Sequence, residues 1–230
     1  MSIIEARGIT KVYQRGRESV HALKGVDLSV EGGEFVSIVG PSGAGKTALL
    51  NILGCLDTPS SGTLTLDNIR ITGKTERDLV KVRRGMIGFV FQQFFLIPTL
   101  TARENISLPL LFNHQTIVDR KIDTILSQVG LSDRESHYPH QLSGGEMQRV
   151  AIGRALVTGP KILLADEPTG NLDTENSNRI FDLFTGLNRE GLTILVVTHN
   201  PALAAKAGRV VRLKDGLIQN NLLLTSECPV

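Results

Sequence analysis

One segment of the chain has the residue types and spacing of a phosphate-binding loop. The P-loop pattern is matched at every fixed position by Gly40-Pro41-Ser42-Gly43-Ala44-Gly45-Lys46-Thr47. Glycines let the backbone curl so that successive N–H groups point at phosphate oxygens, and a helix N-terminus adds positive potential. Lys46 would reach the β- and γ-phosphates, and the Thr47 hydroxyl would ligate Mg²⁺. The sequence therefore predicts a nucleotide site.

Two adjacent carboxylates follow an apolar run and could complete that site. Asp166 and Glu167 come directly after Ile162–Ala165, where an open α/β sheet places its ligands. Asp166 could hold Mg²⁺ beside the P-loop, and Glu167 could polarise the attacking water. His199 follows the run Thr193–Val197, and it is the one histidine among five that lies at a strand end of the predicted core. The assignment of His199 to the nucleotide site depends on the P-loop and the acidic pair, because a lone histidine would not indicate a site.

A second anion-binding helix start is predicted farther along the chain. Ser143 and Glu146 have the spacing of a capping box, with Ser143 as the N-cap of a helix over Gly144–Val157. The capping box by itself would account for Ser143 and Glu146 at this spacing, without any ligand. An exposed, capped helix start that contains Gly144 and Gly145 is also an anion site, so the two interpretations are compatible.

The elements that must position these residues alternate along the second half of the chain. Strands are predicted at Ile3–Arg7, Val20–Val30, Phe35–Val39, Gly62–Leu66, Ile87–Phe91, Ile162–Ala165, Thr193–Val197 and Val210–Leu213. Helices are predicted at Lys46–Gly54, Glu76–Arg84, Ala102–Phe112, Val118–Val129, Gly144–Val157, Glu175–Asn188 and Pro201–Ala207. Alternation of strands and helices favours an α/β fold with a mainly parallel sheet. Lys214-Asp215-Gly216, between two apolar runs, predicts a tight hairpin turn. The strand-rich first 70 residues favour an antiparallel sheet, and the segment from about 93 to 157 favours a helical insertion.

Composition narrows the class of protein. The 230 residues are 41% apolar and 21% charged, which excludes a disordered, collagen-like or disulfide-scaffold chain. A net charge of +2, with no Trp and two Tyr, argues against a nucleic-acid groove. The apolar runs fall short of the roughly 18 residues that a spanning helix needs, and no secretory signal is visible. Cys55 and Cys228 fit a reduced compartment, so we expect a soluble intracellular protein.

The motifs together resemble those of ABC transporter ATPase subunits over about residues 2–221. That resemblance is carried, in the family's order and spacing, by the P-loop, Gln92, Leu142–Glu146, Asp166-Glu167, Asn171-Leu172-Asp173 and His199. It implies the ABC ATPase fold: a single ATP-binding domain over 1–221 with a P-loop core, an N-terminal antiparallel β subdomain and a helical subdomain at about 93–157. A C-terminal tail would follow over 222–230. The segment Ala165–Asp173 resembles the branch of lipoprotein-releasing, macrolide-exporter and cell-division ATPases.

The resemblance also implies an ATP-dependent homodimer with ATP and Mg²⁺ as its cofactors. ATP would lie between the P-loop of one subunit, Gly40 to Ala48, and Ser143, Gly144, Gly145 and Glu146 of the other. Tyr13 would stack on adenine, and Asp173 would act across the interface. The implied Mg²⁺ ligands are Thr47, Gln92 and Asp166, and the implied catalytic residues are Glu167 as the carboxylate, His199 on the γ-phosphate, Gln92 and Lys46.

Two positions depart from the family's commoner pattern. Ala48 stands where a hydroxyl residue is usual, so its side chain cannot donate to the α-phosphate, although its backbone N–H remains. We expect a modest loss of affinity, on the order of 1 kcal/mol for one hydrogen bond. Glu146 stands where Gln is commoner, and it satisfies the capping box equally well.

Four phenylalanines lie close together around Gln92. Phe89 and Phe91 alternate as core residues of a strand would, whereas Phe94 and Phe95 follow the strand, in a loop expected to be polar. An exposed apolar patch marks an interaction site. We therefore predict that the segment Phe94–Phe112 docks a cytoplasmic helix of a transmembrane permease subunit, which would place the chain peripherally on the cytoplasmic face of the inner membrane.

Three functions compete at this level. The first is an ATPase that powers a separately encoded membrane protein, such as an exporter or a lipoprotein-releasing complex. The second is a regulatory or mechanotransmitting ATPase of a cell-division complex with no transported substrate, which the sequence does not separate from the first. The third is an ABC ATPase of DNA repair or chromosome maintenance, which is disfavoured because no sustained heptads separate the P-loop from Ser143.

Overall fold

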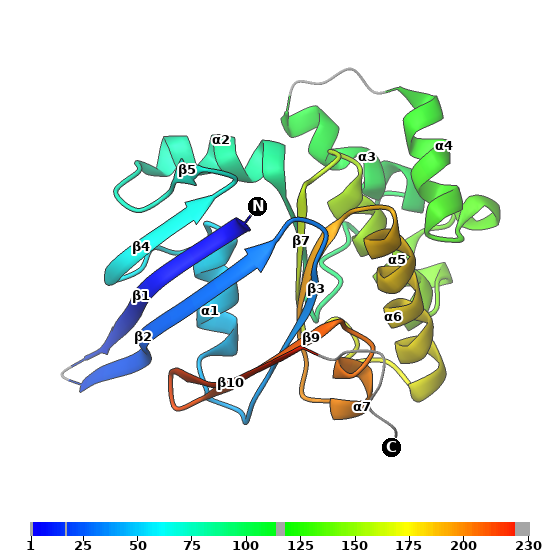
Figure 1. The fold of residues 1–230 in the computed structure, drawn as a ribbon. Helices are drawn as coiled ribbons and strands as arrows, with labels where there is room; N and C mark the ends of the chain where they lie inside the picture. Colours follow the sequence, from blue (N-terminus) through cyan, green and yellow to red (C-terminus); the bar gives the residue numbers. More distant parts are fainter. Residues whose placement is uncertain (1, 17, 114–117, 224–230) are drawn as a thin grey trace.

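The centre of the molecule is a mainly parallel sheet. The computed structural model describes residues 2–16, 18–113 and 118–223, and Figure 1 shows their arrangement. Within those residues the sheet has six strands in the order β10-β9-β3-β8-β7-β6, and only the β9–β10 pair is antiparallel. The bounds are β3 Phe35–Val39, β6 Ile87–Val90, β7 Ile162–Asp166, β8 Thr193–Val197, β9 Arg209–Lys214 and β10 Leu217–Leu223. The predicted α/β fold with a mainly parallel sheet is confirmed.

A second, antiparallel sheet lies on one side of the first. Its order is β2-β1-β4-β5, with β1 Ser2–Arg15, β2 Glu18–Glu31, β4 Ser61–Leu66 and β5 Ile69–Arg70. Helix α1 (Lys46–Leu53) lies between the two sheets (Figure 1) and buries its apolar side chains there. Burial of α1 fixes the start of this helix, and therefore the P-loop, against both sheets.

Helices cover the opposite face of the central sheet. Here lie α3 (Ala102–Phe112), α4 (Asp119–Gln128), α5 (Gly144–Leu156) and α6 (Thr174–Arg189), with the short 3₁₀ turns η1 (Ser132–Arg134) and η2 (Pro139–Gln141). Their apolar faces share one core cluster with strands β6 to β8. In the part of segment 93–157 that the structure describes there is no strand, as predicted. The remaining helices are α2 (Glu76–Met86) and α7 (Pro201–Ala204).

Several element ends differ from the sequence expectation. β6 ends at Val90, where its pairing with β7 stops, so Phe91 lies outside the strand and both Phe89 and Phe91 are only half-buried. The assignment of Phe91 to the core was wrong, whereas Phe89 packs against the core cluster as a partly buried residue. The buried positions of β6 are Gly88 and Val90. Helix α7 ends at Ala204 rather than Ala207, since the chain must enter β9 at Arg209.

The C-terminal end of the described chain contains the predicted hairpin turn and the start of the predicted tail. Lys214 and Leu217 flank the predicted hairpin turn, in which Asp215 and Gly216 have φ of 50° and 80°, as a tight hairpin requires. β10 continues past residue 221 to Leu223, and the rest of the predicted tail and Cys228 lie outside the described residues. Among the described helices none has the length and apolar character to cross a membrane.

Candidate nucleotide site

The P-loop connects the end of β3 to the start of α1, and its glycines are required there sterically. Gly45 has φ of 100°, and a Cβ on it would lie 2.4 Å from the Ala22 carbonyl oxygen. A Cβ on Gly40 would lie 2.0 Å from the Leu213 carbonyl oxygen. Any larger residue at these positions would displace the neighbouring backbone. Lys46 lies across the loop, where its Nζ donates to the carbonyl oxygens of Gly40 and Pro41 at 2.9 and 3.0 Å.

A cavity of about 690 Å³ opens over this loop. It brings together residues from the β1–β2 hairpin, from the P-loop with α1, and from the segments that follow β6, β7 and β8, at a place where parallel strands end. Its lining residues are Tyr13, Ala22, Ser42, Gly43, Ala44, Gly45, Lys46, Thr47, Ala48, Asn51, Gln92, Glu167 and His199. The structure therefore groups the P-loop with Gln92, Glu167 and His199, the three residues outside the loop that were predicted to be catalytic.

Asp166 lies at the end of β7, beside the first residues of α1. The Thr47 hydroxyl donates to Asp166 Oδ1 at 3.3 Å. Burial and the neighbouring Glu167 charge raise the pKa of Asp166, while the Thr47 hydrogen bond and the Lys46 charge act in the opposite direction. A hydroxyl and a carboxylate at hydrogen-bond distance are a hard-oxygen pair of the kind that Mg²⁺ takes together with phosphate oxygens. The residues present fit the implied metal.

Asp166→Asn is expected to stabilise the nucleotide-free protein while removing its activity. Because the folded-state pKa is raised, the charged carboxylate lowers the free energy of unfolding at pH values above its ordinary pKa of 3.8. This cost disappears at lower pH. Asparagine still accepts from Thr47 but carries no charge. Thermal unfolding without metal should give a higher Tm than wild type at pH 7, with the difference shrinking toward pH 4. A lower Tm at pH 7 would contradict the cost assigned to this carboxylate.

Glu167 is held in a strained backbone conformation by its surroundings. It is one of the few non-glycine residues at positive φ, 47°, and its amide donates to the Val197 carbonyl oxygen of β8. Its carboxylate oxygen Oε2 lies 2.8 Å from His199 Nδ1 and 3.3 Å from the His199 amide nitrogen. The carboxylate is mostly buried and the imidazole mostly exposed. β7 and β8 thus bring the predicted base and the predicted γ-phosphate contact together as a hydrogen-bonded pair.

Gln92 reaches the cavity from the loop after β6. Its Nε2 lies 3.5 Å from Asn171 Oδ1, and Asn171 Nδ2 donates to the Gln92 carbonyl oxygen at 3.2 Å. A Cβ on Gly170 would lie 2.7 Å from Gln92 Nε2, so that glycine leaves the space which the amide occupies. The segment after the acidic pair therefore positions Gln92, and Asn171 is a site residue that the sequence motif contained but to which no role was assigned.

Tyr13 lines the same cavity from β1. Its hydroxyl donates to Asp57 Oδ2 at 2.8 Å, and the Lys11 ammonium lies 4.9 Å from the ring centroid. Burial, followed by the hydrogen bond to Asp57, raises the pKa of Tyr13 to about 12. The ring is held in a fixed orientation beside the P-loop, which is compatible with the predicted adenine contact. Asp57 was not foreseen, because it lies in a loop with no recognisable motif.

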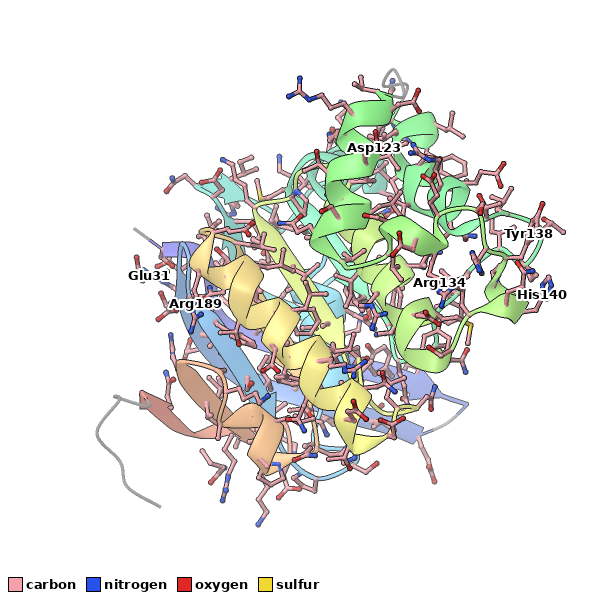
Figure 2. The ribbon with its side chains drawn as sticks, turned by 90° about the vertical axis from the view of Figure 1, so that its right-hand side faces the viewer. Glu31, Asp123, Arg134, Tyr138, His140 and Arg189 are labelled. Carbon is pink, nitrogen blue, oxygen red and sulfur yellow. The ribbon has the colours of Figure 1, made fainter. Side chains whose placement is uncertain are left out.

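Ser143 and Glu146 form the predicted capping box at the start of α5. The Glu146 carboxylate accepts from the Ser143 amide and hydroxyl, and these bonds, opposed by partial burial and helped by Arg134, lower its pKa. Figure 2 shows Arg134, Tyr138 and His140 at the edge of this helical region. Asp173 is the N-cap of α6, and its Oδ1 accepts from the Asn176 amide. Among the described residues that line the nucleotide cavity, none comes from 143–146.

The chain resembles known proteins over nearly all of its length. A family model described as ABC transporter matches residues 23–170. The uncharacterized ABC transporter ATP-binding protein YknY of Bacillus subtilis is 48% identical over 218 residues, covering 94% of this chain and 95% of that one. The macrolide export ATP-binding/permease protein MacB of Bdellovibrio bacteriovorus is 45% identical over 95% of this chain but only 34% of its own length.

A solved structure shares both the fold and the sequence pattern. The ATP-binding cassette MJ0796 of Methanocaldococcus jannaschii, in a dimeric post-hydrolysis state bound to ADP and Pi, superposes with a TM-score of 0.89 at 44% identity. The match covers 97% of this chain and 99% of that one. Together with the P-loop, the acidic pair and the capped helix start, these matches establish that the chain belongs to the ABC transporter family, as one of its ATP-hydrolysing ATP-binding cassettes.

Proposed function

We propose that two copies of this chain close head to tail around ATP and that hydrolysis drives a separately encoded membrane protein. The observation that carries the proposal is the division of the site: the cavity holds the P-loop, Glu167 and His199, whereas Ser143 lies outside it and is exposed. A nucleotide in one chain's cavity therefore leaves that chain's Ser143 helix start available to a second nucleotide. The MJ0796 cassette, which is 44% identical, was solved as a dimer.

The residues of the cavity support hydrolysis by a water activated at Glu167. Lys46 donates to loop carbonyl oxygens, and these contacts would give way to the β- and γ-phosphates of a bound nucleotide. Thr47, Asp166 and Gln92 would hold Mg²⁺, which supplies charge stabilisation between the phosphates when bound. Glu167 would accept the proton of the attacking water, and His199 would fix the orientation of the carboxylate through its 2.8 Å contact. Tyr13 would contact the adenine, and Asp173 would act across the dimer interface.

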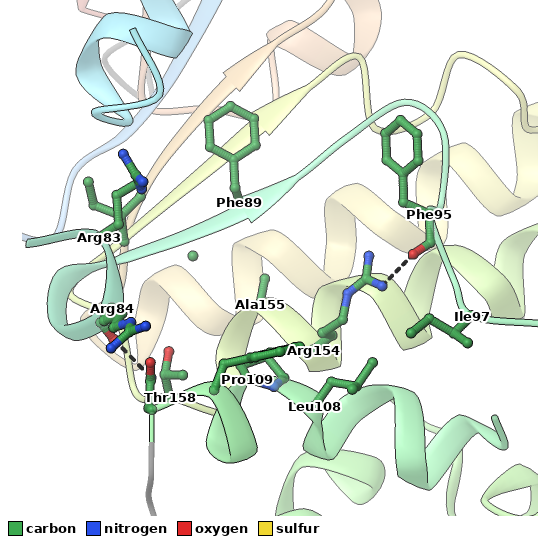
Figure 3. A pocket seen from close by; sticks show the side chains of 14 residues that line it. Arg83, Arg84, Phe89, Phe95, Ile97, Leu108, Pro109, Arg154, Ala155 and Thr158 are labelled. Carbon is green, nitrogen blue, oxygen red and sulfur yellow. Dashed lines mark hydrogen bonds between the residues drawn. The ribbon is translucent and has the colours of Figure 1, made fainter. Parts of the chain in front are cut away.

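An apolar groove supports the proposed membrane partner. Its lining comes from the end of α2, β6, the loop after it, α3 and the end of α5, and Figure 3 shows Phe89, Phe95, Ile97, Leu108 and Pro109 around it. Three arginines, Arg83, Arg84 and Arg154, also line this mainly apolar groove. Phe95 is 60% exposed and Phe112 67% exposed, which is unusual for rings that line a depression. Phe94 does not line the groove; instead its ring lies toward the capped start of α5. The groove has the shape and chemistry to receive an amphipathic helix.

The proposed occupant of this groove is a cytoplasmic helix of a membrane protein. Docking there would place the chain on the cytoplasmic face of the inner membrane. MacB joins an ATP-binding part and a permease in one chain, which favours an exporter-type partner for this cassette. A cell-division complex without a transported substrate is the alternative, and no observation favours it over the exporter.

Co-purification tests the proposal directly. The tagged chain, expressed in its own cells and extracted in mild detergent, should recover a membrane protein whose presence raises the rate of ATP hydrolysis. A partner with spanning segments and a transport pathway would support the exporter, and one without a pathway would support the regulatory alternative. Recovery of the chain without any membrane protein, under conditions that preserve other membrane complexes, would contradict the proposed partnership.

A further inference from the structure

The loop that carries Gln92 is attached to the helical region by side chains of α5. We use the name Gln92 loop for residues 91–101, between β6 and α3. Arg154 donates from one guanidinium nitrogen to the Phe95 carbonyl oxygen at 2.6 Å and from the other to the Phe94 carbonyl oxygen at 2.8 Å. Figure 3 shows the bond to Phe95. Gln148, one and a half turns earlier, donates to the Phe91 carbonyl oxygen at 3.3 Å.

The far end of the loop is attached to α3. Asn105 is fully buried, and its amide nitrogen donates to the carbonyl oxygens of Ile97, Leu100 and Thr101 at 3.0 to 3.2 Å. Its Oδ1 accepts from the Ile97 amide at 2.8 Å. Side chains of α5 and α3 therefore bond to main-chain groups near both ends of the Gln92 loop.

The contacts of this loop with the catalytic core are fewer. The β6 ladder ends at Val90, and beyond it Asn171 donates to the Gln92 carbonyl oxygen at 3.2 Å and lies 3.5 Å from the Gln92 side-chain amide. Bonds from a charged guanidinium to two carbonyls are stronger than neutral ones. The position of the Gln92 loop therefore depends more on α5 and α3 than on the strands of the core.

We propose that Arg154, assisted by Gln148, is a positioning residue for hydrolysis. It attaches the Gln92 loop to α5, so that the placement of Gln92 in the nucleotide cavity depends on the position of that helix. The proposal rests on the proposed function only for the role of Gln92 at the metal and water. Helix α5, about 20 Å long, has Ser143 as its N-cap and carries Arg154 near its other end, so one helix joins the predicted anion site to the groove.

Arg154→Lys is the test variant, because lysine keeps the charge but cannot donate to two carbonyl oxygens in a fixed fork. In the purified chain we expect kcat to fall at least fivefold, while the Kd for ATP without metal, which the P-loop governs, changes less than twofold. Arg209→Lys is the matched control. Arg209 donates to the Ser29 carbonyl oxygen and pairs with Glu34 far from the cavity, so its variant should lose similar stability without a change in kcat.

A double-mutant cycle separates positioning from general loosening of the fold. If Arg154 acts through Gln92, then adding R154K to Q92A should lower kcat less than twofold further. A full fivefold additional loss in the Q92A background would overturn the proposal, as would an unchanged kcat in R154K alone. Both readouts use the isolated chain, so failure to find a membrane partner would contradict the proposed function without deciding this result.

Gln148→Met keeps the proposal testable should R154K unfold. Gln148 is fully buried and its Oε1 has no hydrogen-bond partner among the described residues, so methionine removes one unsatisfied acceptor together with one bond. We expect its Tm to stay close to wild type and its kcat to fall at least twofold, with the Kd for ATP preserved. A well-folded Q148M with wild-type kcat, beside an R154K that does not fold, would overturn the assignment of these residues to positioning.

Discussion

Glu167→Gln is expected to bind ATP normally and to hydrolyse it at least 100-fold more slowly. Glutamine has the shape of glutamate and can still accept from His199, but it cannot take the proton of an attacking water, a function typically worth 10² to 10⁴ in rate. The strained backbone at Glu167 is fixed by the bond of its amide to Val197, so the side chain should keep its direction in the variant. Steady-state ATPase assays and equilibrium ATP binding measure the two quantities.

The same variant should accumulate as a closed dimer. If ATP holds two subunits together and hydrolysis releases them, blocking the chemical step leaves the bound state populated. Size-exclusion chromatography with ATP and Mg²⁺ should move the E167Q peak from monomer to dimer. Glu190→Gln is the matched control: Glu190 accepts from Gln128 away from the cavity, so this variant should behave like wild type. A persistent E167Q monomer with bound ATP would contradict the head-to-tail arrangement, and a kcat within tenfold of wild type would contradict the role of the carboxylate.

Phe95→Asp is expected to abolish association with the membrane partner while preserving the fold. Truncation of an aromatic anchor in a docking groove typically costs 2 kcal/mol or more, about 30-fold in affinity, and aspartate adds an uncompensated charge. The variant should remain stable because Arg154 contacts the backbone of residue 95, not its side chain. Phe95 also has φ of 46°, a region that Asp tolerates better than bulky residues.

Pull-down of the partner from detergent-solubilised membranes is the measurement, with ATP binding by the isolated chain as the test of folding. Val118→Asp is the control: Val118 is 51% exposed, lies outside the groove and occupies the N-cap of α4, where Asp is favoured. It should retain the partner and lose no stability. Equal recovery of the partner by F95D and wild type would show that the groove is not the docking surface.

Much of the site was predictable because its geometry is local. The P-loop, the Ser143–Glu146 box and the hairpin at Asp215 depend on turns and caps that connect residues a few positions apart, and the structure has each of them where the sequence predicted it. The strand-helix alternation likewise predicted the parallel sheet, since parallel strands need crossover connections. Phe91 was misassigned because alternation alone does not indicate where the partner strand stops pairing.

The tertiary structure alone decided which distant residues meet. The Glu167–His199 pair forms because β7 lies beside β8. The Tyr13–Asp57 pair forms because β1 approaches the loop after α1. The hydrogen bonds of Arg154 to the Gln92 loop form because α5 packs against β6. Such contacts follow from strand order and helix packing, which are set by the burial of whole faces rather than by local pattern. The sequence thus determined that this chain binds phosphate and can activate water, because motif residues carry that chemistry. Only the fold placed Ser143 outside its own nucleotide cavity, because one rigid core holds the two sites apart.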